Sequence, residues 1–139
     1  MASVKLSKFV EAMGFKNLTP DIDLTKIRLT VPDINRPALQ LTGYFEHFDK
    51  ERVQMVGYVE YTYLQNMPLE RKIEIYRQYL SYEVPCTIFC SLASPDPEFL
   101  ELARRMPEAR FLWFGWTDPH LIPQEIRQAM EQAPENVTF

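Results

Sequence analysis

The segment INRPALQLTGYFEHF, residues 34–48, carries the side chains of this sequence best suited to binding an anion. Arg36 is the sole guanidinium of its turn, and guanidinium groups recognise carboxylates and phosphates through paired hydrogen bonds. Asn35 and Tyr44 would place an amide and a hydroxyl beside it. The segment follows a strand-like run, and open α/β sheets bind ligands at the carboxyl ends of their strands. Asn35, Arg36 and Tyr44 are therefore candidate ligand-binding residues, and loop residues from later in the chain would complete the crevice: Ser91, Ser94, Thr117 and Asp118.

A structural role for the same segment is the alternative. Pro32 would end a strand, Asn35–Pro37 would turn, and a short helix beginning at Pro37 would end at Gly43. The apolar side chains of the segment would then be buried, the last three as an aromatic wedge: Leu39, Leu41, Tyr44, Phe45 and Phe48. If Arg36 serves binding instead, Arg36→Ala should leave stability nearly intact, because a turn guanidinium contributes little to folding.

Catalytic patterns are absent from the sequence. None of the four glycines belongs to a phosphate-binding loop, and there is no G-x-S-x-G elbow. His47 lies among aromatic residues, which is typical of a packed or half-exposed ring, and His120 beside Pro119 is expected to be solvated. Glu98 and Glu101 are expected on the exposed side of a helix. The sequence therefore predicts no catalytic residue, no metal site and no cofactor in this chain.

Cys86 and Cys90 lie in the strand-like run PCTIFCS. Residues four apart on a strand point to the same face but lie about 13 Å from each other, which is too far for a disulfide. Both are expected to be small buried hydrophobic residues, and reduced thiols fit a cytoplasmic location.

Length and composition indicate one soluble domain over residues 1–139, with 46% hydrophobic residues and a net charge of −4. The acidic balance gives no electrostatic footprint for nucleic acid or for an acidic membrane. The longest apolar stretch, Ala109–Trp116, is far shorter than the about 20 residues of a membrane span. The N-terminus lacks the apolar core of a signal peptide.

Hydrophobic periodicity predicts a helix over residues 4–13, capped by Ser3 and ended by Gly14. Strands and helices then alternate, with Asp96 and Pro97 starting one helix. The expected strands are 26–31, 52–59, 86–90 and 109–114, and the expected later helices are 59–66, 69–80, 96–106 and 121–133. The expected buried stripes are Ile73, Tyr76, Tyr79 and Leu80 on one helix, and Phe99, Leu102, Ala103 and Met106 on another. The alternation predicts an α/β domain with a mainly parallel sheet of about four to five strands and helices on both faces.

Residues 28–64, RLTVPDINRPALQLTGYFEHFDKERVQMVGYVEYTYL, resemble the N-terminal domain of bacterial HPr kinase/phosphorylase. The matching positions are Thr30, Val31, Asp33, Asn35, Arg36, Pro37, Leu39, Leu41, Gly43, Tyr44, Phe45, Phe48, Arg52, Val53, Gln54, Gly57, Glu60 and Leu64. VPCTIFCS and PDPEFLELARRM resemble later parts of that domain. Ala38 stands where the family usually has glycine, and FCSLAS replaces a stretch that often holds arginine and glycine.

The resemblance implies a three-layer α/β/α fold similar to the UDP-substrate domain of Mur ligases. It also implies a hexameric parent enzyme that uses ATP and Mg²⁺ to phosphorylate a serine of the phosphocarrier HPr, and also dephosphorylates it, in carbon catabolite repression. That chemistry belongs to a C-terminal domain whose catalytic residues have no counterpart here.

We therefore expect a non-catalytic regulatory or assembly domain, whose partners are the catalytic domain, sister subunits and HPr. One alternative is a stand-alone sensor that binds a small anionic or nucleotide-sugar-like ligand through Asn35, Arg36, Tyr44, Ser91 and Thr117. A small enzyme of unknown reaction is the other.

Overall fold

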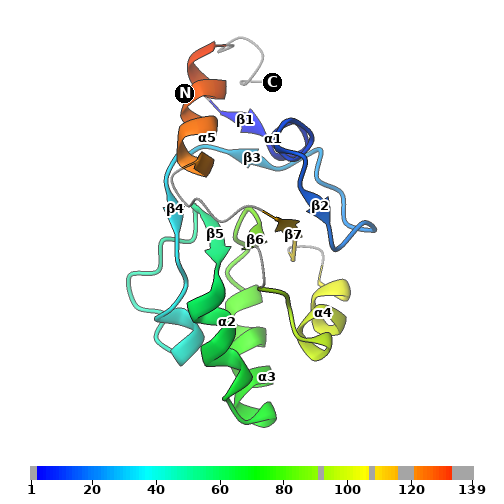
Figure 1. Cartoon of the computed structure of the whole chain (residues 1–139), viewed down its shortest axis with the longest axis vertical. Coiled ribbons are helices and arrows are strands. Elements are labelled where there is room, and N and C mark those ends of the chain that lie inside the picture. The colour runs from blue at the N-terminus through cyan, green and yellow to red at the C-terminus, as the bar shows by residue number, and fades with distance from the viewer. Residues whose placement is uncertain (1–2, 91–92, 107–108, 116–120, 133–139) are drawn as a thin grey trace.

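A five-stranded sheet forms the centre of the protein (Figure 1). The computed structural model describes residues 3–90, 93–106, 109–115 and 121–132. The strands are ordered β2-β7-β6-β5-β4 and comprise β2 (Lys16–Asn17), β4 (Ile34–Asn35), β5 (Val53–Val56), β6 (Thr87–Cys90) and β7 (Phe111–Phe114). β4 to β7 are parallel, and β2 pairs antiparallel with β7. The predicted α/β class with a mainly parallel sheet is confirmed.

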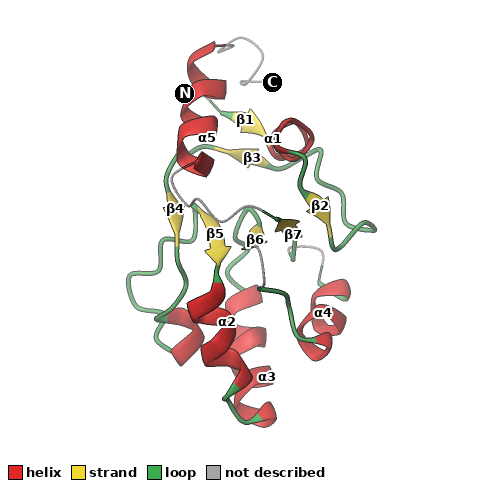
Figure 2. Cartoon of the chain, in the orientation of Figure 1, coloured by secondary structure: helices red, strands yellow, loops and turns green. Residues whose placement is uncertain are grey.

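The helices cover both faces of this sheet (Figure 2). The parallel strands lie side by side in chain order, so right-handed crossovers place the connecting segments on one face. These segments are η1 (Gln40–Thr42), α2 (Tyr58–Gln65), α3 (Leu69–Leu80) and α4 (Pro97–Arg104). The other face is covered by α1 (Leu6–Met13), α5 (Leu121–Gln132) and a two-stranded sheet of β1 (Val4–Lys5) and β3 (Arg28–Leu29). The three-layer arrangement is confirmed.

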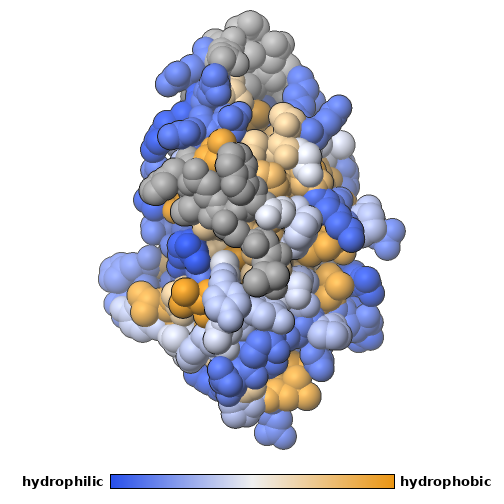
Figure 3. Space-filling view, in the orientation of Figure 1, coloured by the Kyte–Doolittle hydropathy of each residue, from blue (hydrophilic) through white to orange (hydrophobic). Residues whose placement is uncertain are grey.

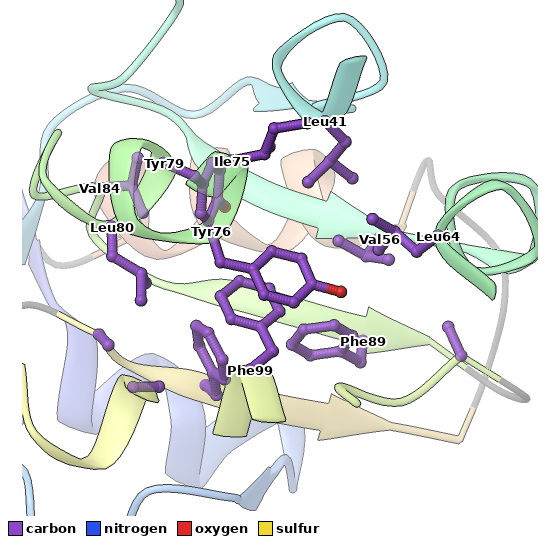
Figure 4. Close-up of a cluster of buried hydrophobic side chains, with 14 of the residues drawn as sticks. Leu41, Val56, Leu64, Ile75, Tyr76, Tyr79, Leu80, Val84, Phe89 and Phe99 are labelled. Carbon is purple, nitrogen blue, oxygen red and sulfur yellow. The ribbon is translucent and has the colours of Figure 1, made fainter. Parts of the chain in front are cut away.

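Successive strand residues point into two different cores, one on each side of the sheet. In β6, Phe89 packs under α3 and α4, while Ile88 and Cys90 pack under α1 and α5. Figure 4 shows the first core, in which the rings of Tyr76 and Phe99 stack with centroids 3.6 Å apart. Burial on both faces explains why β6 and β7 lack the alternation of a half-exposed strand.

Cys86 and Cys90 are both free and buried in the second core, as predicted. Burial raises the pKa of the Cys86 thiol to about 12 and that of Cys90 to about 11. Both thiols therefore stay protonated near neutral pH.

Two predicted features near the N-terminus are wrong. Residues 4–5 form β1, so α1 begins at Leu6 with Lys5 at its N-cap, and Ser3 does not cap it. The predicted strand 26–31 shrinks to β3, which pairs antiparallel with β1 outside the main sheet. The predicted stop at Gly14 is confirmed, because Gly14 has φ 71°.

The later helices agree more closely with the prediction. Pro97 is the first residue of α4 and Asp96 is its N-cap, although the Asp96 side chain does not cap the helix. In α3 the stripe is shifted, because Ile73 is half-buried and Lys72 and Ile75 are buried. The remaining stripe residues, Tyr76, Tyr79, Leu80, Phe99 and Ala103, are buried, and Leu102 and Met106 are half-buried. In the described part of the chain, no helix combines the length and apolarity needed to cross a membrane.

Candidate functional site

The carboxyl ends of β4 and β5 bring a polar cluster together at one edge of the sheet. β4 ends at Asn35, so Arg36 follows directly, and β5 ends at Val56, one residue before Gly57, the N-cap of α2. Asn35 is thus the last residue of a strand and not the first residue of a turn, and this strand was missed by the sequence prediction. The strand is missed because it is only two residues long and follows a proline.

Arg36 forms a two-pronged ion pair with Glu60 of α2. Its Nε donates to Glu60 Oε2 at 2.6 Å, and its Nη2 donates to Oε1 at 2.6 Å. The Glu60 side chain is 2% exposed and the Arg36 side chain 41%. The hydrogen bonds with Glu60 raise the pKa of Arg36 above its ordinary value. The guanidinium is therefore partly exposed but paired with a buried carboxylate, and the predicted small effect of Arg36→Ala on stability does not fit this geometry.

Gly57 allows this pair to form. A Cβ at Gly57 would lie 2.6 Å from Arg36 Nη2, so any larger residue would displace the guanidinium. The Gly57 N–H also donates to Glu60 Oε1 at 3.3 Å. The Glu60 carboxylate thus serves both the arginine and the first turn of α2, where a negative charge is favoured by the helix dipole. Together these contacts fasten the end of β4 to the start of α2.

Asn35 is engaged in the same way. Its amide nitrogen donates to Gln54 Oε1 at 2.6 Å and lies 3.4 Å from Gln40 Oε1. Gln54 is fully buried on β5, and its own amide donates to the carbonyl oxygens of Asp49 and Arg52 at 3.0 Å each. The Asn35 side chain thus joins two neighbouring strands to the loop before β5.

Tyr44 lies away from the buried part of the segment. It is 46% exposed, and its hydroxyl donates to Glu46 Oε2 at 3.3 Å. The His47 side chain is 85% exposed, more than predicted for a packed or half-exposed ring. Leu39 is 60% exposed, so its predicted burial is also wrong.

The aromatic wedge consists of Phe45, Phe48 and Tyr82. The Phe45 ring stacks on Tyr82 with centroids 5.1 Å apart, and Phe48 meets Tyr82 edge-on at 5.2 Å. Phe45 and Phe48 are packed as predicted, whereas Tyr44 is not part of the wedge. The predicted short helix is the 3-10 helix η1, which begins at Gln40 and not at Pro37 as expected, and Gly43 ends it at φ 99°.

Ser91, Thr117, Asp118 and His120 lie outside the described residues. Ser94 is exposed and lines a pocket of about 360 Å³ with mostly apolar walls, formed by Lys16, Leu18, Pro95, Leu100 and Trp113. The structure thus places Asn35 and Arg36 next to each other in the chain at the end of β4, whereas Ser94 lines a pocket with Trp113 of β7. Their role in ligand binding stays a prediction.

A second polar cluster surrounds Asp96. Lys72 Nζ and the Tyr76 hydroxyl each donate to Asp96 Oδ2 at 2.8 Å, and Gln65 Nε2 donates to Oδ1 at 2.7 Å. Burial alone would raise the pKa of Asp96, but the hydrogen bonds from Lys72, Gln65 and Tyr76 together lower it. The sequence signal was a lysine on the apolar side of a helix, four residues before a tyrosine.

Neither cluster resembles a centre for proton transfer. The carboxylates of Glu60 and Asp96 each accept from fixed cationic donors. Burial is the main cause that raises the pKa of Tyr76, so its phenol stays neutral. Within the described ranges, no group of three or more histidine, cysteine or acidic side chains is arranged to hold a metal ion. The arrangement joins helices to the sheet.

Comparison with known proteins identifies relatives of this chain. The family model described as HPr Serine kinase N terminus matches residues 4–107. An HPr kinase/phosphorylase of Lachnoclostridium phytofermentans is 45% identical over 103 residues, which cover 74% of this chain and 33% of the relative. Relatives of the same name in Clostridium botulinum (strain Eklund 17B / Type B) and Latilactobacillus sakei are 36% and 33% identical over 101 residues. These alignments cover 68% and 73% of this chain and 33% and 32% of the relatives. The chain therefore spans about a third of the length of the curated relatives it matches.

Proposed function

We propose, since the chain belongs to the HPr Serine kinase N terminus family, that it is the non-catalytic regulatory and assembly domain of an HPr kinase/phosphorylase. The family match and the missing phosphate loop in the sequence support this assignment. ATP and Mg²⁺ would then bind in the remaining two thirds of the parent protein, which would act on HPr. Sister subunits and the catalytic domain would be the direct partners of this domain.

The exposed face of α2 is the observation that carries the assembly role. Tyr58, Val59 and Tyr63 are 63%, 72% and 46% exposed on this eight-residue helix. The only charged residue of α2, Glu60, is buried against Arg36. Figure 3 shows apolar patches that interrupt the hydrophilic surface at the level of η1 and α2. Aromatic enrichment and depletion of charge are features of the centre of a protein interface.

The Arg36–Glu60 pair gives this face a fixed position. It ties the first turn of α2 to the end of β4, and Leu64 of α2 packs into the first core. A rigid surface loses little conformational entropy when a partner binds. We assign the face to contact with a sister subunit of the parent enzyme.

A chimera tests this role. Residues 4–107 would replace the matching third of the Lachnoclostridium phytofermentans enzyme, whose sequence is similar enough to preserve the core. The chimera should keep the oligomeric state and HPr phosphorylation of its parent. Val59→Glu in the chimera should lower the oligomeric state, measured by light scattering, because it buries a charge at the contact.

Gln78→Glu is the matched control, because Gln78 is exposed on α3 and its substitution adds the same negative charge at a place outside the α2 face. The control chimera should assemble like the parent. If Val59→Glu assembles as completely as Gln78→Glu, the α2 face is not the contact. If deleting the N-terminal third changes neither assembly nor activity of the relative, the regulatory and assembly role itself is wrong.

No observation favours the sensor alternative at the carboxyl edge. Arg36 and Asn35, two of the five residues on which it rested, have internal partners.

A further inference from the structure

A basic pocket lies at the opposite edge of the sheet, where the parallel strands begin. Its volume is about 400 Å³. Lys50 precedes β5, Pro85 precedes β6 and Arg110 precedes β7, and all three line it. Parallel strands start at the same edge, so these positions meet although they are far apart in the sequence. Arg28 of β3 closes the pocket from the other layer.

The charge of this pocket is opposite to that of the chain. Four basic residues line it, Lys26, Arg28, Lys50 and Arg110, against two acidic ones, Glu51 and Glu83. The whole chain has a net charge of −4. A concave surface with an excess of one sign of charge focuses the field and concentrates ions of the other sign. The local excess of positive charge therefore favours an anion.

A neighbouring pocket extends the basic surface. It also has a volume of about 400 Å³ and shares Lys26 and Arg110 with the first. It adds Arg104 and Arg105, both of which form ion pairs with Glu101. The two pockets hold six of the 15 lysines and arginines of the chain but four of its 19 acidic residues. One of those four, Asp23, accepts hydrogen bonds from the backbone and hydroxyl of Thr25, so it is occupied by its own loop.

The two guanidiniums of the first pocket are held in place. Arg110 Nη1 donates to the Val84 carbonyl at 3.0 Å, and Arg28 Nη1 donates to Ser3 Oγ at 3.2 Å. Both arginines are half-buried, whereas Lys26 and Lys50 are exposed at the rim. Positioned guanidiniums bind planar or tetrahedral oxyanions through paired hydrogen bonds, and flexible lysines adapt to the bound group.

We propose that this pocket binds a small multivalent anion of the phosphate or polycarboxylate class. Arg28 and Arg110 would hold the anion, and Lys26 and Lys50 would close over it. The proposal is independent of the assembly role, because the α2 face contributes no lining residue to either pocket.

Calorimetric titration of the purified chain tests the proposal, with pyrophosphate and citrate as the two probes. Sodium chloride at matched ionic strength removes the contribution of general screening. Amide shifts in NMR spectra should change around residues 26–28, 50–51, 82–85 and 110, which locates the bound probe. The tighter of the two probes identifies the class of anion.

The variant pair Lys26→Gln with Lys50→Gln should weaken binding of the tighter probe at least about tenfold, since two charged contacts are lost. Lys8→Gln with Arg77→Gln is the control, because both residues are exposed on helices, neither lines either pocket, and the charge change is equal. The control should stay within about twofold of wild type, as expected for screened charges outside the site. Equal weakening by both variant pairs, shifts confined to other residues, or no binding of either probe overturns the proposal.

Discussion

Replacing Arg36 by alanine should destabilise the domain strongly, because it strands a buried carboxylate. The Glu60 side chain is 2% exposed and loses both of its 2.6 Å hydrogen bonds from the guanidinium. Removing one partner of a buried ion pair costs about 3–5 kcal/mol. The Arg36 side chain is 41% exposed, so water partly replaces it, and we expect about 2–4 kcal/mol.

Urea unfolding measures this loss. With a slope of about 2 kcal/mol per molar urea for a domain of this size, the midpoint should fall by about 1–2 M. Arg36→Lys should lie in between, because it keeps the charge but loses the two-pronged geometry. The double variant of Arg36→Ala with Glu60→Ala should be less destabilised than the sum of the single variants, which a double-mutant cycle detects.

Arg127→Ala is a matched control for burial. Arg127 Nη2 lies 2.6 Å from Asp33 Oδ1, the same distance as in the buried pair, but the two side chains are 52% and 46% exposed. Such surface pairs contribute about 0–1 kcal/mol. Equal midpoints for Arg36→Ala and Arg127→Ala would refute the argument that the Arg36–Glu60 pair holds α2 on the sheet.

Four further predictions follow from the structure. Phe45→Ala should cost about 3–5 kcal/mol, because the ring is 9% exposed and packed on aromatic neighbours; a wild-type denaturant midpoint would contradict this. Because its pKa is lowered, the charged Asp96 carboxylate stabilises the fold above pH 3.8, its ordinary pKa, and this stabilisation is lost as the pH falls through the lower pKa of the folded state. Asp96→Asn should therefore flatten the acid limb of stability against pH, measured by urea midpoints. Cys86 and Cys90 should resist a thiol reagent at about pH 8 until the chain is unfolded, since burial keeps both protonated; fast labelling of the native protein would count against their burial. The chain alone should neither hydrolyse ATP nor phosphorylate HPr, and turnover above a buffer blank that survives repurification would disprove this.

The parts of the fold that sequence predicts well are those with strong periodicity. The helix expected over residues 69–80 is α3 at the same boundaries, and the apolar runs around Ile88 and Leu112 are central strands. Two-residue strands such as β2 and β4 carry no periodic signal, because their pairing depends on neighbours distant in sequence. The same limit explains why β3 was expected in the main sheet.

The candidate site was predicted less well for a related reason. Arg36 and Asn35 were found as residues able to bind an anion, but their partners Glu60 and Gln54 are 24 and 19 residues away. Sequence alone does not distinguish an arginine that faces solvent from one that meets a buried glutamate. Exposure of Tyr44 was likewise decided by the turn at Gly43, which directs Phe45 into the core.

The geometry gives a physical meaning to the segment 34–48 and the residues that follow it. Asn35 holds Gln54 on β5, Arg36 holds Glu60 on α2, and Pro37 between β4 and η1 is buried. Gly57 lies under the guanidinium, where a side chain would not fit. Several positions that carry the resemblance, namely Asn35, Arg36, Gln54, Gly57 and Glu60, are therefore partners of one another in space, and they stabilise the junction of two strands and one helix. A motif made of mutual contacts favours a structural role over direct ligand binding, and the surface it holds in place is the uncharged face of α2 that we assign to assembly.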